Sequence, residues 1–346
     1  MIRDLNIESE KLVTLLKQPG NILLVSHYNP DGDAIGSVLA LYHYLKEKGH
    51  QVSLIVPNDF PDFLKWMPGS DNIVVYFKHQ KTATKIINES NVIICVDFND
   101  VTRLKDLGTK LVSSDAAKVL IDHHPKPDDI YKIMINNTGV SSTAELIYNF
   151  ICKAGDRRLI DSKIAECIYC GIMTDTGCFS FNSSNPETFL IIADLLKCGI
   201  SKDKIFNRVY DNFSYNRMKL LGYCLNKKMV VLPEYHTAFI YLTRKEMEKH
   251  HFKPGDSEGF VNLPFSIEGV NITALFLEKK DEIRISMRSR GGFAVNSFCT
   301  ENFEGGGHKN AAGGESHISM KKTIEKFKKL LELYRHEIET VQWFGE

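Results

Sequence analysis

The sequence predicts an α/β protein with two domains: a doubly wound, mainly parallel sheet joined by a helical connector to a smaller α/β domain. Three observations lead to this expectation. The chain has 346 residues, which is too long for one ordinary compact core. Short apolar runs alternate with helical patterns in its first part, as in parallel sheets. This alternation gives way to longer strand-like runs beyond residue 228.

The first elements predict a β-loop-α-β unit. Residues 7–20 carry leucines at helical spacing and end at Pro19-Gly20, and residues 21–27 (NILLVSH) are typical of a buried strand. A polar loop over residues 28–37 leads into a helix that Gly49 ends, and residues 51–56 resume as a strand. Strands linked through a helix in this way are expected to run parallel.

The same pattern continues to about residue 200. Residues 91–100 and 118–125 each contain a short apolar run suited to a strand that is covered on both faces. Helical patterns follow over 141–155, 161–173 and 187–199. We expect a catalytic domain over residues 1–200, a charged helical connector over 201–228 and a substrate-binding domain over 229–346, with the active site in the cleft between the domains.

The last part of the chain predicts a smaller α/β domain. Strand-like runs occur within residues 229–243 and 270–289, and residues 320–339 form an amphipathic helical pattern.

Composition narrows the class of protein. Hydrophobic residues make up 43% of the chain and charged residues 25%, which are the proportions of a folded globular protein. The 43 basic residues equal the 43 acidic ones, so the chain lacks the positive field that holds long nucleic acids. No apolar run approaches the roughly 20 residues that span a bilayer. We therefore expect a soluble protein without a membrane partner.

The eight cysteines favour a reducing, cytoplasmic location, because they are scattered through apolar segments and no secretory leader is seen. Cys167 and Cys170 form a CxxC pair, which can bind metal or exchange disulfides. No second pair accompanies it, and its surroundings are helical and apolar. We interpret both as buried core thiols.

Metal-ligating side chains gather at four places in the first domain, which we expect to be ends of strands. They are His27, Asp31 and Asp33 in SHYNPDGD, Asp97 in CVDFND, Asp122, His123 and His124 in IDHHP, and Asp175 in MTDTG. Taken singly, each has a structural explanation as a turn, a helix cap or a solvated side chain. A parallel sheet brings the carboxyl ends of its strands to one crevice, where these carboxylates would repel one another unless cations neutralised them. The pattern therefore predicts a metal centre.

The type of ligand suggests the metal. Carboxylates combined with imidazoles suit Mn²⁺, Fe²⁺, Co²⁺ or Zn²⁺, whereas Mg²⁺ prefers oxygen ligands. Mn²⁺ is our first choice. Six side chains exceed what one open catalytic ion needs, so we expect two divalent ions that share a carboxylate.

These residues resemble, in order along the chain, the four motifs of the DHH phosphoesterase superfamily. The resemblance implies that His27, Asp31 and Asp97 bind one ion, and that Asp33, Asp97, His123 and Asp175 bind the other, with Asp97 bridging. It implies that His124 faces the substrate phosphate and that Asp122 orients the histidines.

Residues 284–314 extend the resemblance to the DHH-associated C-terminal domain, through GGGH (Gly305, Gly306, Gly307 and His308) and the following AGG. A glycine run lets backbone amides approach an anion, and Arg288 and His308 add charge and hydrogen bonds. We therefore expect the substrate to be bound by Arg288, His308 and the three glycines Gly305, Gly306 and Gly307. A glycine-rich turn is the structural alternative. Arg103 is either a further crevice residue or a surface arginine. Ser142, Thr143 and Glu145 predict a helix cap and first turn, and we leave them out of the catalytic set.

The resemblance points to the compact oligoribonuclease and pAp-phosphatase group of the superfamily. The GGGH segment argues against family II pyrophosphatases, and the chain lacks room for the modules of the long exonucleases or the sensors of membrane-bound phosphodiesterases. The expected substrates are single-stranded RNA of two to about five nucleotides and 3′-phosphoadenosine 5′-phosphate (pAp), hydrolysed by in-line attack on phosphorus.

Some alternatives stay open. The chain could instead hydrolyse linear or cyclic dinucleotides, and a non-enzymatic nucleotide-binding protein is the competing class. The latter would be expected to have lost metal ligands, and none is missing here. A monomer and a homodimer are both compatible with the sequence.

Overall fold

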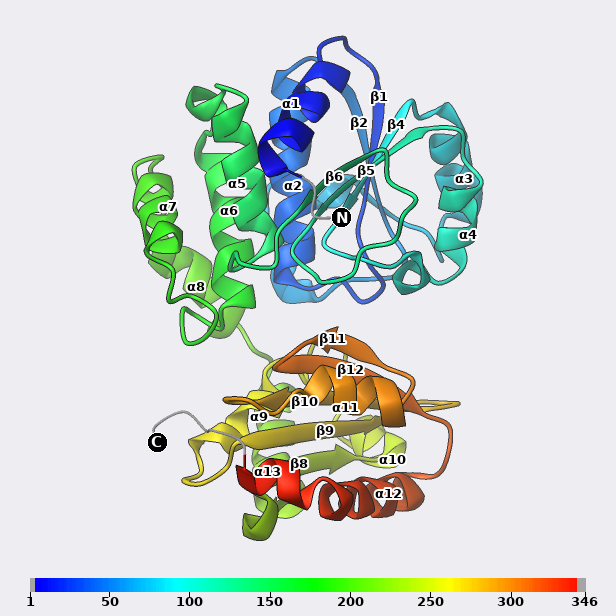
Figure 1. Cartoon of the computed structure of the whole chain (residues 1–346), viewed down its shortest axis with the longest axis vertical. Helices are drawn as coiled ribbons and strands as arrows, with labels where there is room; N and C mark the ends of the chain where they lie inside the picture. The colour runs from blue at the N-terminus through cyan, green and yellow to red at the C-terminus, as the bar shows by residue number, and fades with distance from the viewer. Residues whose placement is uncertain (1–3, 341–346) are drawn as a thin grey trace. The chain divides into compact units, whose positions relative to one another are not determined.

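The computed structural model of the chain describes residues 4–340 and divides into two compact units, Met1–Asn212 and Phe213–Glu346 (Figure 1). Each unit is described by itself. The division falls inside the stretch 201–228, between α8 (Lys202–Tyr210) and α9 (Tyr215–Tyr223). Within residues 4–340, none of the helices is both long and apolar enough to cross a membrane.

A six-stranded parallel sheet forms the centre of the first unit, in the order β3-β2-β1-β4-β5-β6. Its strands are β1 (Asn21–Val25), β2 (Gln51–Val56), β3 (Ile73–Val75), β4 (Val92–Val96), β5 (Ala117–Asp122) and β6 (Ile133–Asn136). This sheet confirms the predicted doubly wound, parallel fold. The strand order reverses direction between β1 and β4, and in such sheets ligands bind outside the carboxyl ends of the strands at this point.

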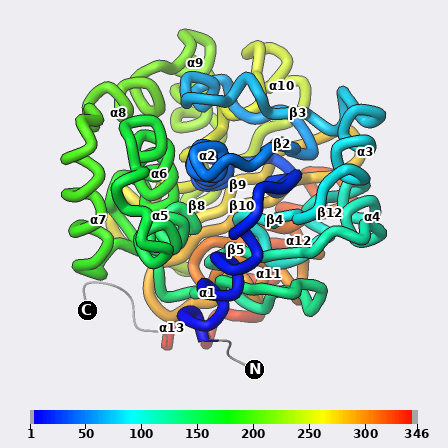
Figure 2. Tube along the Cα trace, turned by 90° about the horizontal axis from the view of Figure 1, so that it is seen from above, coloured from blue at the N-terminus to red at the C-terminus, as the bar shows by residue number. Residues whose placement is uncertain are grey.

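Helices cover both faces of the sheet (Figure 2). Alternate residues of β1 pack into two different cores: Ile22 and Leu24 face one, and Leu23 and Val25 the other. The first core includes α1 (Leu5–Leu15), α2 (Gly32–Glu47), α5 (Thr143–Lys153), α6 (Ser162–Asp175) and α7 (Pro186–Leu196); the second includes α3 (Gln80–Glu89) and α4 (Asp106–Val112). Burial on both faces explains why the strands are apolar throughout.

Two glycines allow α2, α5 and α6 to pack closely. A Cβ atom on Gly36 of α2 would lie 2.5 Å from the backbone oxygen of Cys167 in α6. A Cβ atom on Gly171 of α6 would lie 2.6 Å from the Cβ of Ala144 and 2.9 Å from Oδ1 of Asp33. All three distances are too short for a side chain, so glycine is required where these helices meet. Cys167 and Cys170 are buried, free thiols of α6, as interpreted from the sequence.

The second unit contains a mixed sheet in the order β11-β12-β10-β9-β8-β7. Its strands are β7 (Met229–Leu232), β8 (Thr237–Leu242), β9 (Ile272–Glu278), β10 (Ile283–Ser289), β11 (Gly306–His308) and β12 (Ala311–Ser316). Only β8 and β9 pair in parallel among these strands. This unit confirms the predicted second α/β domain.

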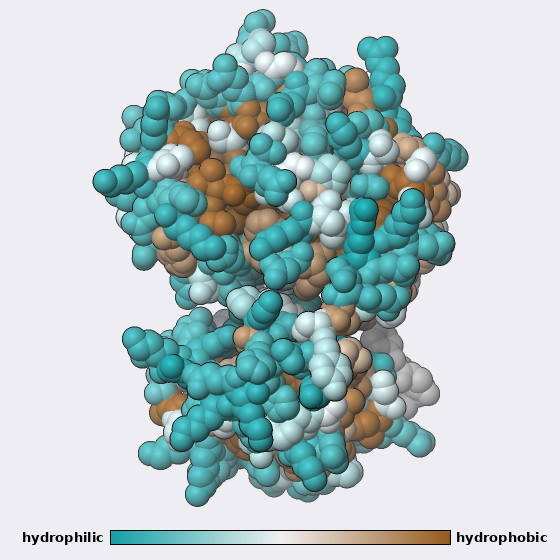
Figure 3. All heavy atoms as spheres, turned by 180° about the vertical axis from the view of Figure 1, so that it is seen from behind, coloured by the Kyte–Doolittle hydropathy of each residue, from teal (hydrophilic) through white to brown (hydrophobic). Residues whose placement is uncertain are grey.

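Helices also cover both faces of this second sheet. One core contains Phe239, Phe276 and side chains of α11 (Val295–Asn302), α12 (Met320–Leu333) and α13 (Arg335–Thr340). The other contains Leu275, Leu277 and side chains of α9 and α10 (Arg244–Lys249). The surface view in Figure 3 shows that hydrophilic residues predominate on the face drawn, with apolar residues in separate patches.

Candidate metal centre

The predicted ligands of the first unit gather at the carboxyl edge of its sheet, around the point where the strand order reverses. His27, Asp31 and Asp33 follow β1, and Asp97 follows the neighbouring β4. Asp122 is the last residue of β5, and His123 and His124 come next. Parallel strands thus bring together residues that are far apart in the sequence.

Asp175 has a different origin from the one expected. It was predicted to end a strand, but it is the last residue of helix α6. The prediction of a strand end is wrong because MTDTG continues the helical pattern of the preceding residues by one turn. The close packing of α6 on α2 nevertheless brings Asp175 to the same group of side chains.

His27, Asp31 and Asp97 form the first group, and each offers a ligand atom within 4.8 Å of the others. His27 donates from Nδ1 to the carbonyl oxygen of Tyr28 at 3.0 Å. Its Nε2 is therefore the unprotonated atom of the neutral ring, and it lies 3.5 Å from Oδ2 of Asp97. That Nε2 is buried and has no hydrogen-bond partner. A buried imidazole nitrogen held in this tautomer is suited to metal binding.

Asp33, His123 and Asp175 form the second group, again with ligand atoms within 4.8 Å of one another. Nε2 of His123 lies 3.5 Å from Oδ2 of Asp175 and 4.0 Å from Oδ2 of Asp33. Asp97 lies between the two groups, because its Oδ1 is 3.6 Å from Nε2 of His123 while its Oδ2 faces His27. One carboxylate therefore faces both sets of ligands.

The backbone at Asp97 is held in an uncommon conformation, with φ at +66°. Few non-glycine residues adopt this left-handed region, and such residues cluster at functional sites. The amide of Asp97 donates to the carbonyl oxygen of Ile121 at 3.1 Å, which ties the turn after β4 to β5. The carboxylate of Asp97 thus stands just beyond the end of β4, between His27 and His123.

The first turn of α5 contacts the centre in a way that sequence reasoning missed. The amides of Thr143 and Ala144 donate to Oδ2 and Oδ1 of Asp33 at 2.7 and 2.9 Å. The Thr143 hydroxyl donates to Oδ1 of Asp97 at 2.8 Å. Ser142 caps the helix, as predicted. The capping signature was visible in SSTAE, but it did not reveal that this helix start binds two carboxylates of the site.

Without cations, these carboxylates are in an unfavourable environment. Burial, together with the charges of Asp97 and Asp31, holds the pKa of Asp33 well above its usual range. Burial and the charges of Asp31, Asp122 and Asp175 do the same to the pKa of Asp97. Burial, reinforced by Arg103, lowers the pKa of His27 to about 4, so this ring is neutral at physiological pH. Neutral imidazoles among buried carboxylates form a donor set that fits divalent cations.

Asp122, His124 and Arg103 form a chain of hydrogen bonds beside the two groups. His124 donates from Nδ1 to Oδ1 of Asp122 at 2.7 Å, and Asp122 is fully buried. Nη1 of Arg103 donates to Nε2 of His124 at 3.2 Å. Burial and the nearby Arg103 hold the pKa of His124 well below its usual range. Arg103 therefore contacts His124, and its predicted binding of substrate stays a prediction.

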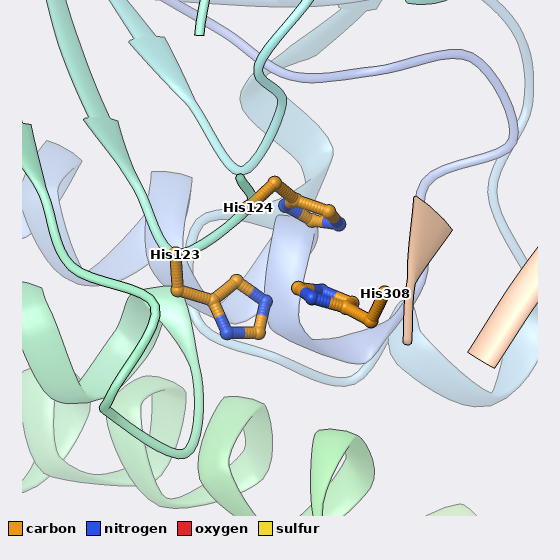
Figure 4. Close-up of side chains that lie close together, drawn as sticks. All are labelled: His123, His124 and His308. Atoms are coloured by element: carbon orange, nitrogen blue, oxygen red, sulfur yellow. The ribbon is translucent and has the colours of Figure 1, made fainter. Parts of the chain in front are cut away.

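His123 and His124 are drawn in Figure 4, where both project from the segment after β5. Their ring centroids are 4.8 Å apart and the ring planes cross at 80°. His123 thus faces the carboxylates of Asp33 and Asp175, while His124 is turned toward Asp122 and Arg103. The two adjacent histidines therefore face different groups of side chains.

Arg288 and His308 lie on one face of the second sheet. His308 of β11 pairs with Ala311 of β12, which pairs with Arg288 of β10. Residues paired across strands share a face of the sheet, so the small Ala311 separates the two longer side chains. Arg288 also donates from Nη1 to the carbonyl oxygen of Met287 at 2.9 Å.

The neighbouring glycines are required by the hairpin itself. A Cβ atom on Gly305 would lie 2.0 Å from the carbonyl oxygen of Gly313, and one on Gly307 would lie 2.5 Å from that of Ala311. Gly307 also has φ at +139°. Gly306 differs, because its nearest contact would be the Thr300 hydroxyl at 3.8 Å. Strand packing thus accounts for two glycines of the run, and their predicted binding of substrate stays a prediction.

Comparisons with known proteins agree with this architecture. A crystal structure of an exopolyphosphatase-related protein from Bacteroides fragilis is 44% identical, with a TM-score of 0.91, over 96% of this chain and 98% of that one. The bifunctional oligoribonuclease and PAP phosphatase NrnA of Bacillus subtilis is 27% identical over 307 residues, covering 88% of this chain and 91% of the relative. RecJ from Thermus thermophilus, solved with Mn²⁺, shares the fold at 12% identity and a TM-score of 0.56, over 96% of this chain and 55% of RecJ.

Two family descriptions match separate parts of the chain. Residues 21–172 match the DHH family, N-terminal domain, and residues 234–340 match the DHHA1 domain. The first match contains every predicted ligand except Asp175, and the second contains Arg288 and His308. The resemblance inferred from the sequence is confirmed: the chain belongs to the DHH phosphoesterase family, with a DHH domain followed by a DHHA1 domain.

Proposed function

We propose that this chain is a two-metal phosphoesterase that hydrolyses short oligoribonucleotides to mononucleotides and pAp to AMP and phosphate. The observation that carries the proposal is the position of Asp97. Its two carboxylate oxygens face different groups of ligands, one through His27 and the other through His123. A carboxylate in this position is suited to bridge two divalent ions.

The donor set assigns residues to the two ions. His27, Asp31 and Asp97 would hold one ion, and Asp33, Asp97, His123 and Asp175 the other. Bound ions polarise a phosphoryl oxygen and make water a strong nucleophile at neutral pH. We favour Mn²⁺ over Mg²⁺, because each group includes an imidazole nitrogen.

Arg103, His124 and Asp122 are assigned to the substrate phosphate. Asp122 accepts from Nδ1 of His124 and so directs Nε2 of the same ring toward Arg103. A phosphoryl group that binds here would accept hydrogen bonds from the guanidinium, and its negative charge would favour protonation of His124 at Nε2. The protonated ring could then donate to a phosphoryl oxygen as negative charge develops. Asp122 acts as a positioning residue that sets this orientation.

The substrate class rests on the relatives and on the second unit. The curated relatives of Bacillus subtilis and Thermus thermophilus are both named as oligoribonucleases and PAP phosphatases, at 27% identity. In this chain, Arg288 and His308 flank Ala311 on one sheet face, and we assign them, with the amides of the glycine run, to a terminal phosphate of the substrate. The eight free cysteines suit a reducing compartment, so we propose a cytoplasmic enzyme.

Turnover by chelated and metal-reloaded protein tests the proposal. The substrates are pAp, labelled oligoribonucleotides from two to about twenty nucleotides, and a cyclic dinucleotide. We expect no activity after chelation, more recovery with Mn²⁺ than with Mg²⁺ at equal free concentration, and the highest kcat/KM on pAp and the shortest RNAs. Hydrolysis that survives chelation, or that is restricted to the cyclic dinucleotide, would contradict the proposal.

A further inference from the structure

Two aromatic side chains and a lysine lie beside the metal centre and are not among its predicted ligands. The rings of Tyr28 and Phe77 contact each other edge to face, with centroids 6.0 Å apart. Nζ of Lys105 lies 5.9 Å from the centroid of the Tyr28 ring. We call Tyr28, Phe77 and Lys105 the aromatic platform.

The sheet topology places this platform next to the centre. Tyr28 follows β1, and Phe77 comes two residues after the end of β3. Strands β1, β2 and β3 are adjacent and parallel, so the segments after them lie at the same carboxyl edge as the metal ligands. The ligands extend from β1 toward β4 and β5, and the platform extends from β1 toward β3. Two strand spacings, about 10 Å, separate β1 from β3, which is comparable with the reach of a nucleotide from its phosphate to its base.

Hydrogen bonds join the platform to the centre itself. The carbonyl oxygen of Tyr28 accepts from Nδ1 of His27, and the amide of Tyr28 donates to the carbonyl oxygen of Arg103 at 2.8 Å. Tyr28 is therefore fixed between a predicted metal ligand and the arginine that contacts His124. Lys105 comes two residues after Arg103, so the segment that supplies a phosphate-binding cation also supplies the cation of the platform.

The far side of the platform is held by its own contacts. The amide of Phe77 donates to the carbonyl oxygen of Pro57 at 3.1 Å. Asn58 bonds twice to Asn29, through its side-chain amide to Oδ1 at 3.0 Å and by accepting from the backbone amide at 2.6 Å. The segments after β1, β2 and β3 are thus tied together, which presents the two rings on a fixed support.

The exposure of Phe77 is not explained by packing. The preceding Tyr76 is buried in the core beneath the sheet, whereas Phe77 leaves 43% of its surface exposed. An exposed aromatic ring in contact with a second ring, with a lysine nearby, is the combination with which proteins stack nucleobases.

We propose that the aromatic platform stacks a nucleobase of the substrate, next to the phosphate held at the metal centre. This inference rests on the proposed function and adds a base-binding subsite in the first unit. It commits to an aromatic heterocycle as the occupant. A base supplies the flat π surface that Tyr28 and Phe77 complement, and an adjacent phosphate supplies the negative charge that Lys105 attracts.

Turnover of dinucleotides with and without each base tests the proposal. The variants are Phe77→Ala and Tyr28→Ala, with Tyr28→Phe as the conservative change and Phe189→Ala as the matched control, since Phe189 is 49% exposed on α7. We expect kcat/KM on a 5′-phosphorylated diribonucleotide to fall about tenfold or more in the two alanine variants, as for loss of one stacked base. The conservative and control variants should stay near wild type.

Abasic analogues identify the base. Two analogues of the diribonucleotide each lack one of its bases. On one of them, the alanine variants should have the same kcat/KM as wild type, because the base that stacks on the platform is already absent. An equal loss on the complete dinucleotide and on both abasic analogues would show that the residues support the fold of the centre, and it would overturn the proposal. Melting temperature and bound Mn²⁺ per chain should be unchanged in Phe77→Ala.

A binding measurement separates this inference from the proposed function. Chelated wild-type protein is titrated into a 5′-phosphorylated dinucleotide that contains 2-aminopurine, whose fluorescence is quenched by stacking. Quenching that is lost in Phe77→Ala and kept in Phe189→Ala would support the platform even if no substrate were hydrolysed. Quenching that is equal in all variants, or absent from wild type, would refute it, whatever the enzyme hydrolyses.

Discussion

The two glycine-containing motifs of this chain use their glycines in the same way, for close packing, but differ in the side chains beside them. In the first unit, the glycines of PDGDAIGS permit close helix packing, and the chemistry lies in the carboxylates beside them. In the second unit, Gly305 and Gly307 of GGGH permit close packing of β11 on β12. The first motif, however, joins a cluster of buried carboxylates and imidazoles that the fold alone does not explain. The second presents one arginine and one histidine on a sheet face. Buried charge distinguishes a metal centre from a binding surface more clearly than glycine content does.

The largest expected effect is at Asp97. We expect Asp97→Asn to reduce turnover of every phosphoester to roughly a thousandth of wild type or less, because the Asp97 carboxylate faces both groups of ligands. The fold should survive, since the neutral amide also removes a buried charge from a repulsive cluster. Steady-state kinetics with Mn²⁺ and a thermal melt of the chelated protein measure both effects. Activity within tenfold of wild type would contradict the bridging assignment.

Thr143 should have the next largest effect, on metal affinity. Its hydroxyl fixes Oδ1 of Asp97, so Thr143→Val should weaken Mn²⁺ binding by about ten- to a hundredfold, as for other residues that orient ligands. Thr143→Ser keeps the hydroxyl and should restore most of the affinity. Calorimetric titration of the chelated proteins with Mn²⁺ gives the comparison. If the Thr143→Val and Thr143→Ser variants bind Mn²⁺ equally well, the hydroxyl does not position Asp97.

Arg288 and His308 should affect substrate and leave the metals in place. Loss of a charge-assisted hydrogen bond of about 1.5–3 kcal/mol in Arg288→Ala or His308→Ala should lower kcat/KM on a 5′-phosphorylated oligonucleotide by one to two orders of magnitude. Hydrolysis of bis-p-nitrophenyl phosphate should persist wherever the wild type accepts it, because this ester has no terminal phosphate. Equal proportional losses on both substrates would place these residues in the catalytic centre.

The smallest expected effect is on the free energy of unfolding, and it concerns the packing of the glycine run. Gly305→Ala should destabilise the protein by about 1–3 kcal/mol, because its Cβ would overlap the backbone of Gly313. In Gly306→Ala the added Cβ would meet only the Thr300 hydroxyl, at an ordinary contact distance of 3.8 Å, so this variant should unfold like wild type and keep its backbone amide. Urea denaturation of both variants makes the comparison. Similar stability of the two would show that the hairpin tolerates a side chain at Gly305.

Sequence reasoning anticipated the sheet and the gathering of the predicted ligands at its carboxyl edge, because strand ends and acidic residues coincide in most of the local patterns. His27, Asp97 and His123 needed only the rule that parallel strands end at one edge. Sequence reasoning placed Asp175 at the end of a strand, because the length of α6 depends on its packing against α2. It gave Thr143 only a capping role, because no local signal shows which carboxylates a helix start will meet. The contact between Tyr28 and Phe77 likewise depends on three loops that only the fold brings together.

We propose that hydrolysis depends on two divalent ions at the carboxyl edge of the first sheet. Titration of chelated protein with Mn²⁺, with bound ions per chain and turnover of pAp followed in the same samples, tests it most directly. We expect two ions per chain at saturation, and turnover that rises with the second ion bound. The Asp97→Asn variant should bind the ions more weakly and remain inactive. Full activity with one ion per chain, or with none, would contradict the account.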